Sequence, residues 1–116
     1  AAARRDFFLT VQHGQFYQGK PVIGYDLPGF GDELCGLPYL PRLIAKARAK
    51  LVGSMGDDII YCCENDRRFF RDHGNIHPAD FLRVVWAAGD SDPKVYDYVR
   101  QRTLSVSSAV PDNEQT

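Results

Sequence analysis

A chain of 116 residues and 13.1 kDa has room for one domain of ordinary size. Hydrophobic residues make up 44% of the chain and charged residues 25%, which is typical of a globular protein and excludes a fibrous or low-complexity chain. Lys and Arg number 14 and Asp and Glu 15, so the formal net charge of -1 gives no overall argument for a polyanion-binding protein. No apolar run approaches the roughly 20 residues that a membrane-spanning helix needs, so no membrane contact is expected.

The first 24 residues are rich in residue types that favour strands. Residues 7–11 and 16–17 are mostly aromatic or aliphatic, and the sequence Gln-Gly-Lys-Pro at 18–21 is typical of a turn. We therefore expect residues 1–24 to form an irregular or partly β arm, or a short hairpin. Residues 26–38 contain too much Gly and Pro for a regular element, and we expect a loop that packs through Leu27, Phe30, Leu34 and Leu37.

Four helices are predicted after this loop. The clearest spans residues 40–51, where one apolar stripe consists of Leu40, Leu43, Ile44, Ala47 and Leu51, and Gly53 is a plausible end. The second begins at Asn65 or Asp66 and ends at Gly74, and the third begins at Pro78 and ends at Gly89. The fourth begins at Asp92, which Pro93 follows. The expected buried residues of the last two helices are Phe81, Leu82, Val85, Trp86, Val95, Tyr98 and Val99.

The predicted fold class is mainly α, a compact four-helix-type domain over residues 25–104 with an irregular or partly β N-terminal arm. No strand-helix-strand pattern is present, which argues against a parallel sheet. Residues 105–116 are rich in Ser, Asn, Asp and Pro, and we expect them to form a disordered tail.

Residues 40–56 carry the pattern L-P-R-L-I-x-K-A-R-A-x-L-x-G-x-x-G. Two further blocks follow, Asp-Arg-Arg-Phe-Phe at 66–70 and Ser-Asp-Pro-Lys-Val-Tyr-Asp-Tyr-Val at 91–99. Together they resemble a bacterial family known only as a domain of unknown function, over roughly residues 25–100. Ala45 departs from the family pattern, which has Asp there. The resemblance implies a compact helical fold and supplies no reaction.

The three cysteines are Cys35, Cys62 and Cys63, an odd number that argues against a secreted disulfide framework. We expect reduced thiols and a cytoplasmic protein. Cys62, Cys63, His73 and His77 also invite a zinc hypothesis, but adjacent cysteines point to opposite faces of an extended chain, and Gly74 and Pro78 break any helix that would align the histidines. We therefore expect no metal and no cofactor.

The basic residues are better organised than any catalytic motif. Arg42, Lys46 and Lys50 recur every four residues along one flank of the helix at 40–51. With Arg48, Arg67 and Arg68 they form a candidate face for an anionic ligand or a nucleic acid. The alternative is a solvated helix flank whose cations pair with nearby carboxylates.

Two function classes remain open from the sequence. The favoured one is a non-enzymatic binding or interaction domain, whose partner is an anion bound at this basic face or a second copy of the chain bound through residues 7–23. The alternative is a small enzyme built around Cys62, Cys63 and His73, in which the helix start beside the cysteines favours a reactive thiol. No recognisable nucleophile or acid-base spacing occurs, so the sequence leans away from an enzyme.

Overall fold

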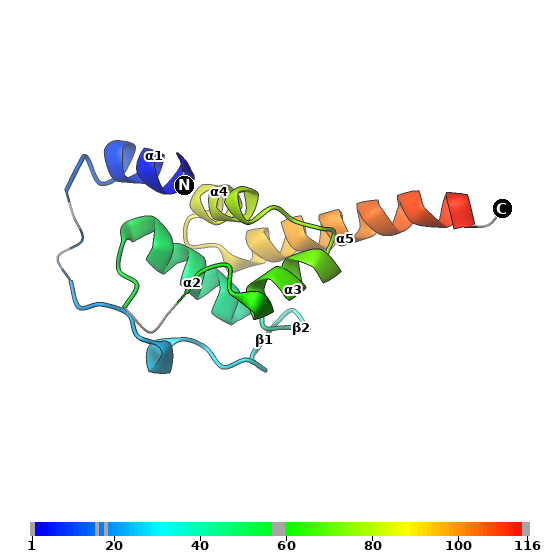
Figure 1. Cartoon of the computed structure of the whole chain (residues 1–116), viewed down its shortest axis with the longest axis horizontal. Helices are drawn as coiled ribbons and strands as arrows, with labels where there is room; N and C mark the ends of the chain where they lie inside the picture. Colours follow the sequence, from blue (N-terminus) through cyan, green and yellow to red (C-terminus); the bar gives the residue numbers. More distant parts are fainter. Residues whose placement is uncertain (1, 16, 18, 57–59, 115–116) are drawn as a thin grey trace.

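The computed structural model describes residues 2–15, 17, 19–56 and 60–114 and is mainly helical, which confirms the predicted fold class. The order of elements in this part of the chain is α1 (Ala2–Thr10), a short 3-10 helix (Gly24–Asp26), β1 (Glu33–Leu34), β2 (Leu37–Pro38), α2 (Leu40–Val52), α3 (Glu64–Asp72), α4 (Pro78–Ala88) and α5 (Asp92–Glu114). Figure 1 shows α2 near the centre, with the other helices around it. Asp57 and Asp58, two of the carboxylates near in sequence to the basic helix, lie outside the described residues.

Helix α2 supplies one side of the core, as its apolar stripe predicts. The five stripe residues are all buried: Leu40, Leu43, Ile44, Ala47 and Leu51. Gly53 ends the helix in the left-handed conformation, with φ +78°, and its N–H donates to the carbonyls of Ala49 and Lys50. A residue with a Cβ adopts this conformation less readily, which is why the helix stops there.

Helices α4 and α5 supply the opposite side of the core. Phe81, Leu82 and Val85 of α4 are at most 1% exposed, and Val95 and Val99 of α5 are fully buried. The predicted starts of both helices are confirmed, at Pro78 and Asp92. Helix α3 begins at Glu64, slightly earlier than the sequence predicts, because Cys63 rather than Asn65 or Asp66 is the cap residue.

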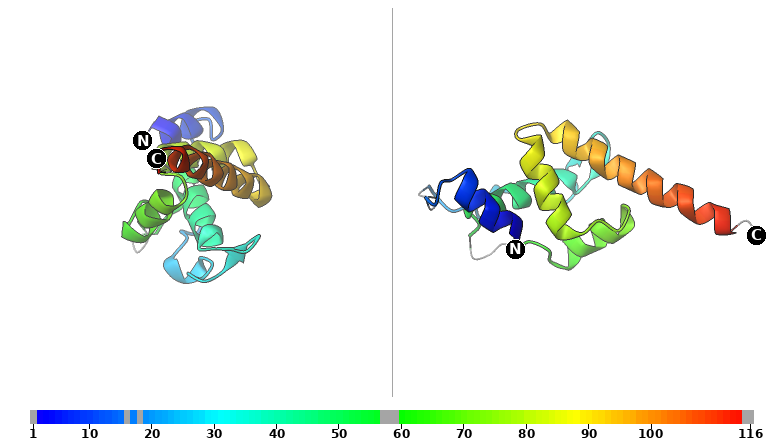
Figure 2. Two further views of the ribbon diagram at one scale, coloured as in Figure 1. Left: turned by 90° about the vertical axis from the view of Figure 1, so that its right-hand side faces the viewer. Right: turned by 90° about the horizontal axis from the view of Figure 1, so that it is seen from above.

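The N-terminal segment differs from the expected strand or hairpin at residues 2–10, which form helix α1. Ala3 is 1% exposed, the ring of Phe7 meets that of Trp86 edge-on at 5.3 Å, and Asp6 pairs with Arg83 of α4 at 2.8 Å. Both figures of the whole chain place α1 beside α4 (Figures 1 and 2). Packing against α4 therefore outweighs the weak strand preference of Phe7 and its neighbours.

Residues 11–39 contain the irregular and partly β part of the fold. Strands β1 and β2 pair in antiparallel register, Glu33 with Pro38 and Leu34 with Leu37. The two turn residues, Cys35 and Gly36, have φ +53° and φ +85°, which is the conformation of a tight two-residue hairpin turn. The loop expected over residues 26–38 thus contains a very short hairpin. Leu27 is buried, Leu34 and Leu37 are partly buried against the core, and Phe30 is exposed.

The last helix is longer than the sequence predicts. Helix α5 runs to Glu114 and projects beyond the other helices, so it includes residues 105–114 of the segment expected to form the tail (Figure 1). The loop before α4 crosses α5 closely, since a Cβ on Gly74 would lie 2.7 Å from the backbone of Arg102. None of the helices in the described ranges is long and apolar enough to cross a membrane.

Candidate functional site

A buried carboxylate, Asp66, organises the region between α2 and α3. Asp66 is the third residue of α3 and is 0% exposed. Its Oδ2 accepts hydrogen bonds from the backbone N–H groups of Cys62, at 2.8 Å, and Cys63, at 3.3 Å. The side chain therefore holds the chain that enters α3, as an acidic residue near a helix N-terminus does.

Tyr39, directly before α2, and Lys46, in the middle of α2, complete the environment of Asp66. Lys46 donates from Nζ to Oδ2 at 2.7 Å, and the Tyr39 hydroxyl donates to Oδ1. Lys46 is itself only 4% exposed, so the charges of this pair offset each other inside the protein. Tyr39 is half-buried. We call Tyr39, Lys46 and Asp66 the buried triad, after its two buried charges.

Two residues at the triad, Tyr39 and Cys62, have the positive φ angles that residues other than glycine rarely adopt. Tyr39 precedes α2 with φ +76°, and Cys62 precedes Cys63 with φ +72°. The Tyr39 carbonyl nevertheless accepts the first helical hydrogen bond of α2, from Leu43 N at 3.1 Å. Non-glycine residues at positive φ carry a conformational cost, and such residues cluster at functional sites.

Burial and the negative charge of Asp66 both raise the pKa values of two tyrosines, Tyr39 and Tyr61. Loss of solvent raises the pKa of Tyr39 well above its usual value, and the hydrogen bond to Asp66 raises it further. Burial, followed by the charge of Asp66, raises the pKa of Tyr61 in the same direction. Both hydroxyls therefore stay protonated as hydrogen-bond donors, to Asp66 and to the Pro78 carbonyl respectively.

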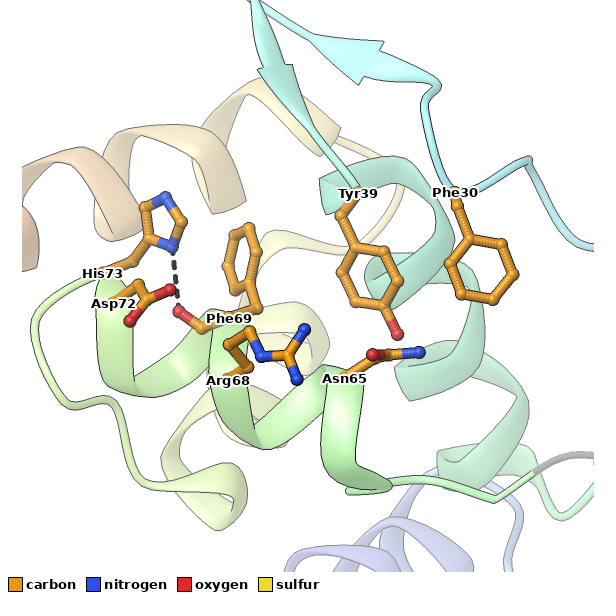
Figure 3. Close-up of a pocket in the computed structure, with 7 residues that line it drawn as sticks. All are labelled: Phe30, Tyr39, Asn65, Arg68, Phe69, Asp72 and His73. Carbon is orange, nitrogen blue, oxygen red and sulfur yellow. Dashed lines mark hydrogen bonds between the residues drawn. The ribbon is translucent and has the colours of Figure 1, made fainter.

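Two adjoining cavities open on the outer side of the triad. The first, which we call the ring lobe, has a volume of about 250 Å³ and is lined by Phe30, Tyr39, Asn65, Arg68, Phe69, Asp72 and His73. The second, the basic lobe, has about 190 Å³ and is lined by Phe30, Tyr39, Arg42, Lys46, Ile60, Cys63 and Asn65. The lobes share Phe30, Tyr39 and Asn65. Figure 3 shows the four rings of the ring lobe in a row, with the polar side chains of α3 beside them.

The outer wall of both lobes is Phe30, a residue of the loop before β1. Its ring is 56% exposed, and the guanidinium of Arg42 lies over it at 4.2 Å from the ring centroid. Arg42 also donates from Nη1 to the Pro28 carbonyl at 3.0 Å. An exposed aromatic ring is thus held in place by a cation of α2.

The structure does not bring the predicted basic residues onto one face. The prediction that Lys46 faces solvent is wrong. Lys46 is buried and paired with Asp66, because α3 packs beside this flank of α2. Arg48 pairs with Asp92 at 2.5 Å. Lys50 is half-buried, and Arg67 and Arg68 are exposed on α3. Of the six predicted anion-binding residues, the lobes contain Arg42, Lys46 and Arg68.

The structure does not bring His73 close to Cys62 and Cys63, as the enzyme hypothesis requires. His73 follows α3 and stacks on Phe69 with 4.1 Å between ring centroids, and its Nδ1 lies 2.8 Å from the Phe69 carbonyl. Cys63 precedes the same helix. Ten residues separate it from His73, and at the helical rise per residue this places the two backbones about 15 Å apart. The close neighbour of the Cys63 sulfur is instead Lys46, whose Nζ lies at 3.5 Å.

The other residues of the zinc hypothesis lie apart. His77 accepts a hydrogen bond from Ala79 N at the start of α4. Within the described ranges, no three His, Cys, Asp or Glu side chains gather as metal ligands do. Cys35, Cys62 and Cys63 are free thiols.

Sequence reasoning missed Tyr39, Phe30 and the role of Asp66 beyond capping. One signal was available, because an acidic residue three positions after a cap residue is the capping-box spacing that places Asp66 under Cys62 and Cys63. The pairing with Lys46 joins residues that are 20 positions apart, and helical periodicity carries no information about it.

The comparison with known families places the site in context. A family model described as "Domain of unknown function (DUF5069)" matches residues 31–110. The match includes the buried triad and both lobes apart from Phe30. No curated protein and no solved structure matches the chain. Since the match spans more than half of the sequence, the chain belongs to the family of the domain of unknown function DUF5069.

Proposed function

We propose that this protein is a binding domain for a small anionic ligand that carries a planar ring. The observation that carries the proposal is the pair of adjoining lobes, one walled by aromatic rings and the other containing two cationic side chains. Together their volumes fall in the range of small-molecule sites, which begins at about 300 Å³. The ring of such a ligand occupies the ring lobe and its anionic group the basic lobe.

The charges in the basic lobe favour an anion. The charge of Lys46 is offset by Asp66 at 2.7 Å. Arg42 has no carboxylate within ion-pair distance among the residues that the structure describes, and its guanidinium has donors beyond the one used by Pro28. An incoming carboxylate or phosphate therefore meets a guanidinium that is not paired with any carboxylate in the described part of the chain. A guanidinium is the group best suited to bind such an anion with two parallel hydrogen bonds.

The site needs little rearrangement before binding. The Tyr39 ring forms a wall of both lobes, and its hydroxyl is fixed by a fully buried carboxylate. Asp66 is held in turn by Lys46 and by the backbone that enters α3. A wall that is already ordered loses little conformational entropy when the ligand binds, which favours affinity.

This proposal favours a small anion over a nucleic acid, the other partner that the sequence suggests for the basic residues. A nucleic acid bound along the row of Arg42, Lys46 and Lys50 would need three exposed cations, and the burial of Lys46 interrupts that row. A small anion needs only the concave site around Arg42.

Phenyl phosphate and phenol form the matched pair of probes that tests this function. Isothermal titration calorimetry is expected to show phenyl phosphate binding at least tenfold more tightly than phenol, a difference of about 1.4 kcal/mol for a charge-assisted hydrogen bond. Arg42→Gln is expected to remove this difference. Arg67→Gln, on the exposed side of α3 and outside both lobes, is the control and should leave it intact. Equal binding of the two probes by the parent protein would contradict the proposal.

A second candidate function rests on the contact between Cys63 and Lys46. The Cys63 sulfur lines the basic lobe, and Lys46 Nζ lies 3.5 Å from it. A partly exposed sulfur with a hydrogen-bond donor beside it is a typical setting for a nucleophilic cysteine. On this proposal Cys63 is a reactive thiol and acts without His73.

Alkylation by iodoacetamide tests the second candidate. The sulfur–carbon bond forms as iodide leaves, and the thiol proton passes to solvent. Mass spectrometry is expected to show Cys63 modified faster than Cys35, although Cys35 is the more exposed of the two. Lys46→Met is expected to slow Cys63 and to leave Cys35 unchanged. A Cys63 that reacts more slowly than Cys35 in the parent protein would rule out the reactive thiol.

A further inference from the structure

We infer that the ligand is a purine nucleoside monophosphate whose base is guanine, an inference that rests on the proposed function and names the substrate class of the same site. Three features support it in turn: the aromatic wall, the polar edge of α3, and the guanidinium of Arg42 in the basic lobe.

The aromatic wall suits a planar heterocycle. Successive ring centroids along the ring lobe are separated by 5.8 Å from Phe30 to Tyr39, by 6.0 Å from Tyr39 to Phe69, and by 4.1 Å from Phe69 to His73. The rings follow one another along the lobe (Figure 3). Phe69 is buried, so the accessible ring surface belongs to Phe30, Tyr39 and His73. Bases stack on such rings because every base presents a π-face.

The polar edge of the ring lobe both donates and accepts hydrogen bonds. Arg68 and Asp72 lie one helical turn apart on α3, and Asn65 lies nearly one turn before Arg68, so all three line the same side of the lobe. Arginine donates, aspartate accepts and the asparagine amide does both. One N–H of Arg68 faces Glu64, whose Oε2 lies 3.5 Å from Nη2, and an arginine has five N–H groups, so further donors remain for a ligand. A base that fits must offer acceptors and N–H donors side by side.

Guanine meets this requirement. Its O6 and N7 are acceptors that arginine contacts with two hydrogen bonds, and its ring and exocyclic N–H groups are donors that a carboxylate accepts. Adenine offers an exocyclic amino group but no O6, so it leaves the donors of Arg68 less well matched. Asp72 and Arg68 together therefore favour guanine over adenine.

The basic lobe suits one phosphate. Its volume of about 190 Å³ contains a single cation without a carboxylate partner among the described residues, Arg42. The two lobes meet at Tyr39 and Asn65, which is where the sugar between base and phosphate would lie. One unpaired guanidinium matches one phosphate better than a chain of two or three.

The test compares guanosine monophosphate with adenosine monophosphate, guanosine and phenyl phosphate by isothermal titration calorimetry of the full chain. Guanosine monophosphate is expected to bind at least tenfold more tightly than each of the other three. Asp72→Asn is expected to weaken guanosine monophosphate at least tenfold and to leave phenyl phosphate unchanged. Asp97→Asn, an exposed aspartate of α5 outside both lobes, is the matched control and should change neither.

The outcomes separate this inference from the function on which it rests. Binding of phenyl phosphate that depends on Arg42, with guanosine monophosphate no tighter than phenyl phosphate, overturns the nucleotide and keeps the anion site. Equal affinity for guanosine and adenosine monophosphates overturns the role of Asp72 and the assignment of guanine. Failure of every phosphate probe to bind overturns both proposals.

Discussion

Removing the negative charge of Asp66 while Lys46 remains is expected to destabilise the fold severely. The Lys46 side chain is 5% exposed, and Asp66 is the only carboxylate paired with it among the described residues. Asp66→Asn leaves that ammonium buried without a counter-charge, a change that typically costs about 3–5 kcal/mol. This is a large part of the 5–15 kcal/mol that stabilises an ordinary domain.

The opposite change should be milder. Lys46→Met leaves the carboxylate of Asp66 with hydrogen bonds from Tyr39, Cys62 and Cys63. The loss is then close to one hydrogen bond to a charged group, about 2 kcal/mol. The double variant removes both charges, so it should be more stable than the sum of the single effects predicts, by about 2 kcal/mol.

Equilibrium unfolding in urea, followed by circular dichroism at 222 nm, measures all three free energies. Arg48→Met is the control, because the pair of Arg48 with Asp92 is more than one-third exposed and should contribute less than about 1 kcal/mol. The reasoning is refuted if Lys46→Met costs more than Asp66→Asn, or if Asp66→Asn costs less than 1 kcal/mol.

Two further predictions concern residues outside the lobes. Burial raises the pKa of Tyr61 in the folded protein, so above pH 10 the unfolded chain loses the hydroxyl proton first. The free energy of unfolding then falls by about 1.4 kcal/mol per pH unit above pH 10. Below pH 10 the contribution of this proton to stability is fully present. Tyr61→Phe is expected to be less stable than the parent at pH 8, and urea unfolding at pH 11 should show this difference reduced by about that amount; an unchanged difference contradicts the shift. Gly74→Ala is expected to lower the free energy of unfolding by more than 2 kcal/mol, since it combines φ +95° with a Cβ 2.7 Å from the Arg102 backbone. Gly14→Ala, at φ +74° with open space around it, should cost about 1 kcal/mol, and equal effects of the two would show that the close approach is unimportant.

The sequence is most informative where a helix combines a periodic stripe with a local start and stop. Helix α2 has its five-residue stripe and Gly53, and α4 has Pro78 and Gly89. Helix α1 has no such marks: no acidic residue in its first turn and no basic residue in its last. Its burial against Trp86 depends on a contact between residues far apart in the chain, which local patterns do not encode.

The site was predictable in its residue types but not in its arrangement. The sequence singled out Arg42, Lys46 and Cys63, and all three line the basic lobe. It placed Lys46 in solvent, because a lysine beside an apolar stripe usually extends its charge into water. Only the position of α3 against α2 brings Asp66 within 2.7 Å of that lysine.

Helix α1 lies outside the 31–110 segment matched by the family, yet it covers part of the core of that segment. A fragment beginning at residue 31 would expose the sides of Trp86 and Leu51 that line the hollow next to Phe7. In the full chain α1 is covalently linked to the surface that it covers, so its docking is intramolecular and independent of protein concentration. The folded unit to express, truncate or fuse is therefore larger than the segment that the family model matches. A peptide of residues 2–10 added in trans should dock where the missing helix was.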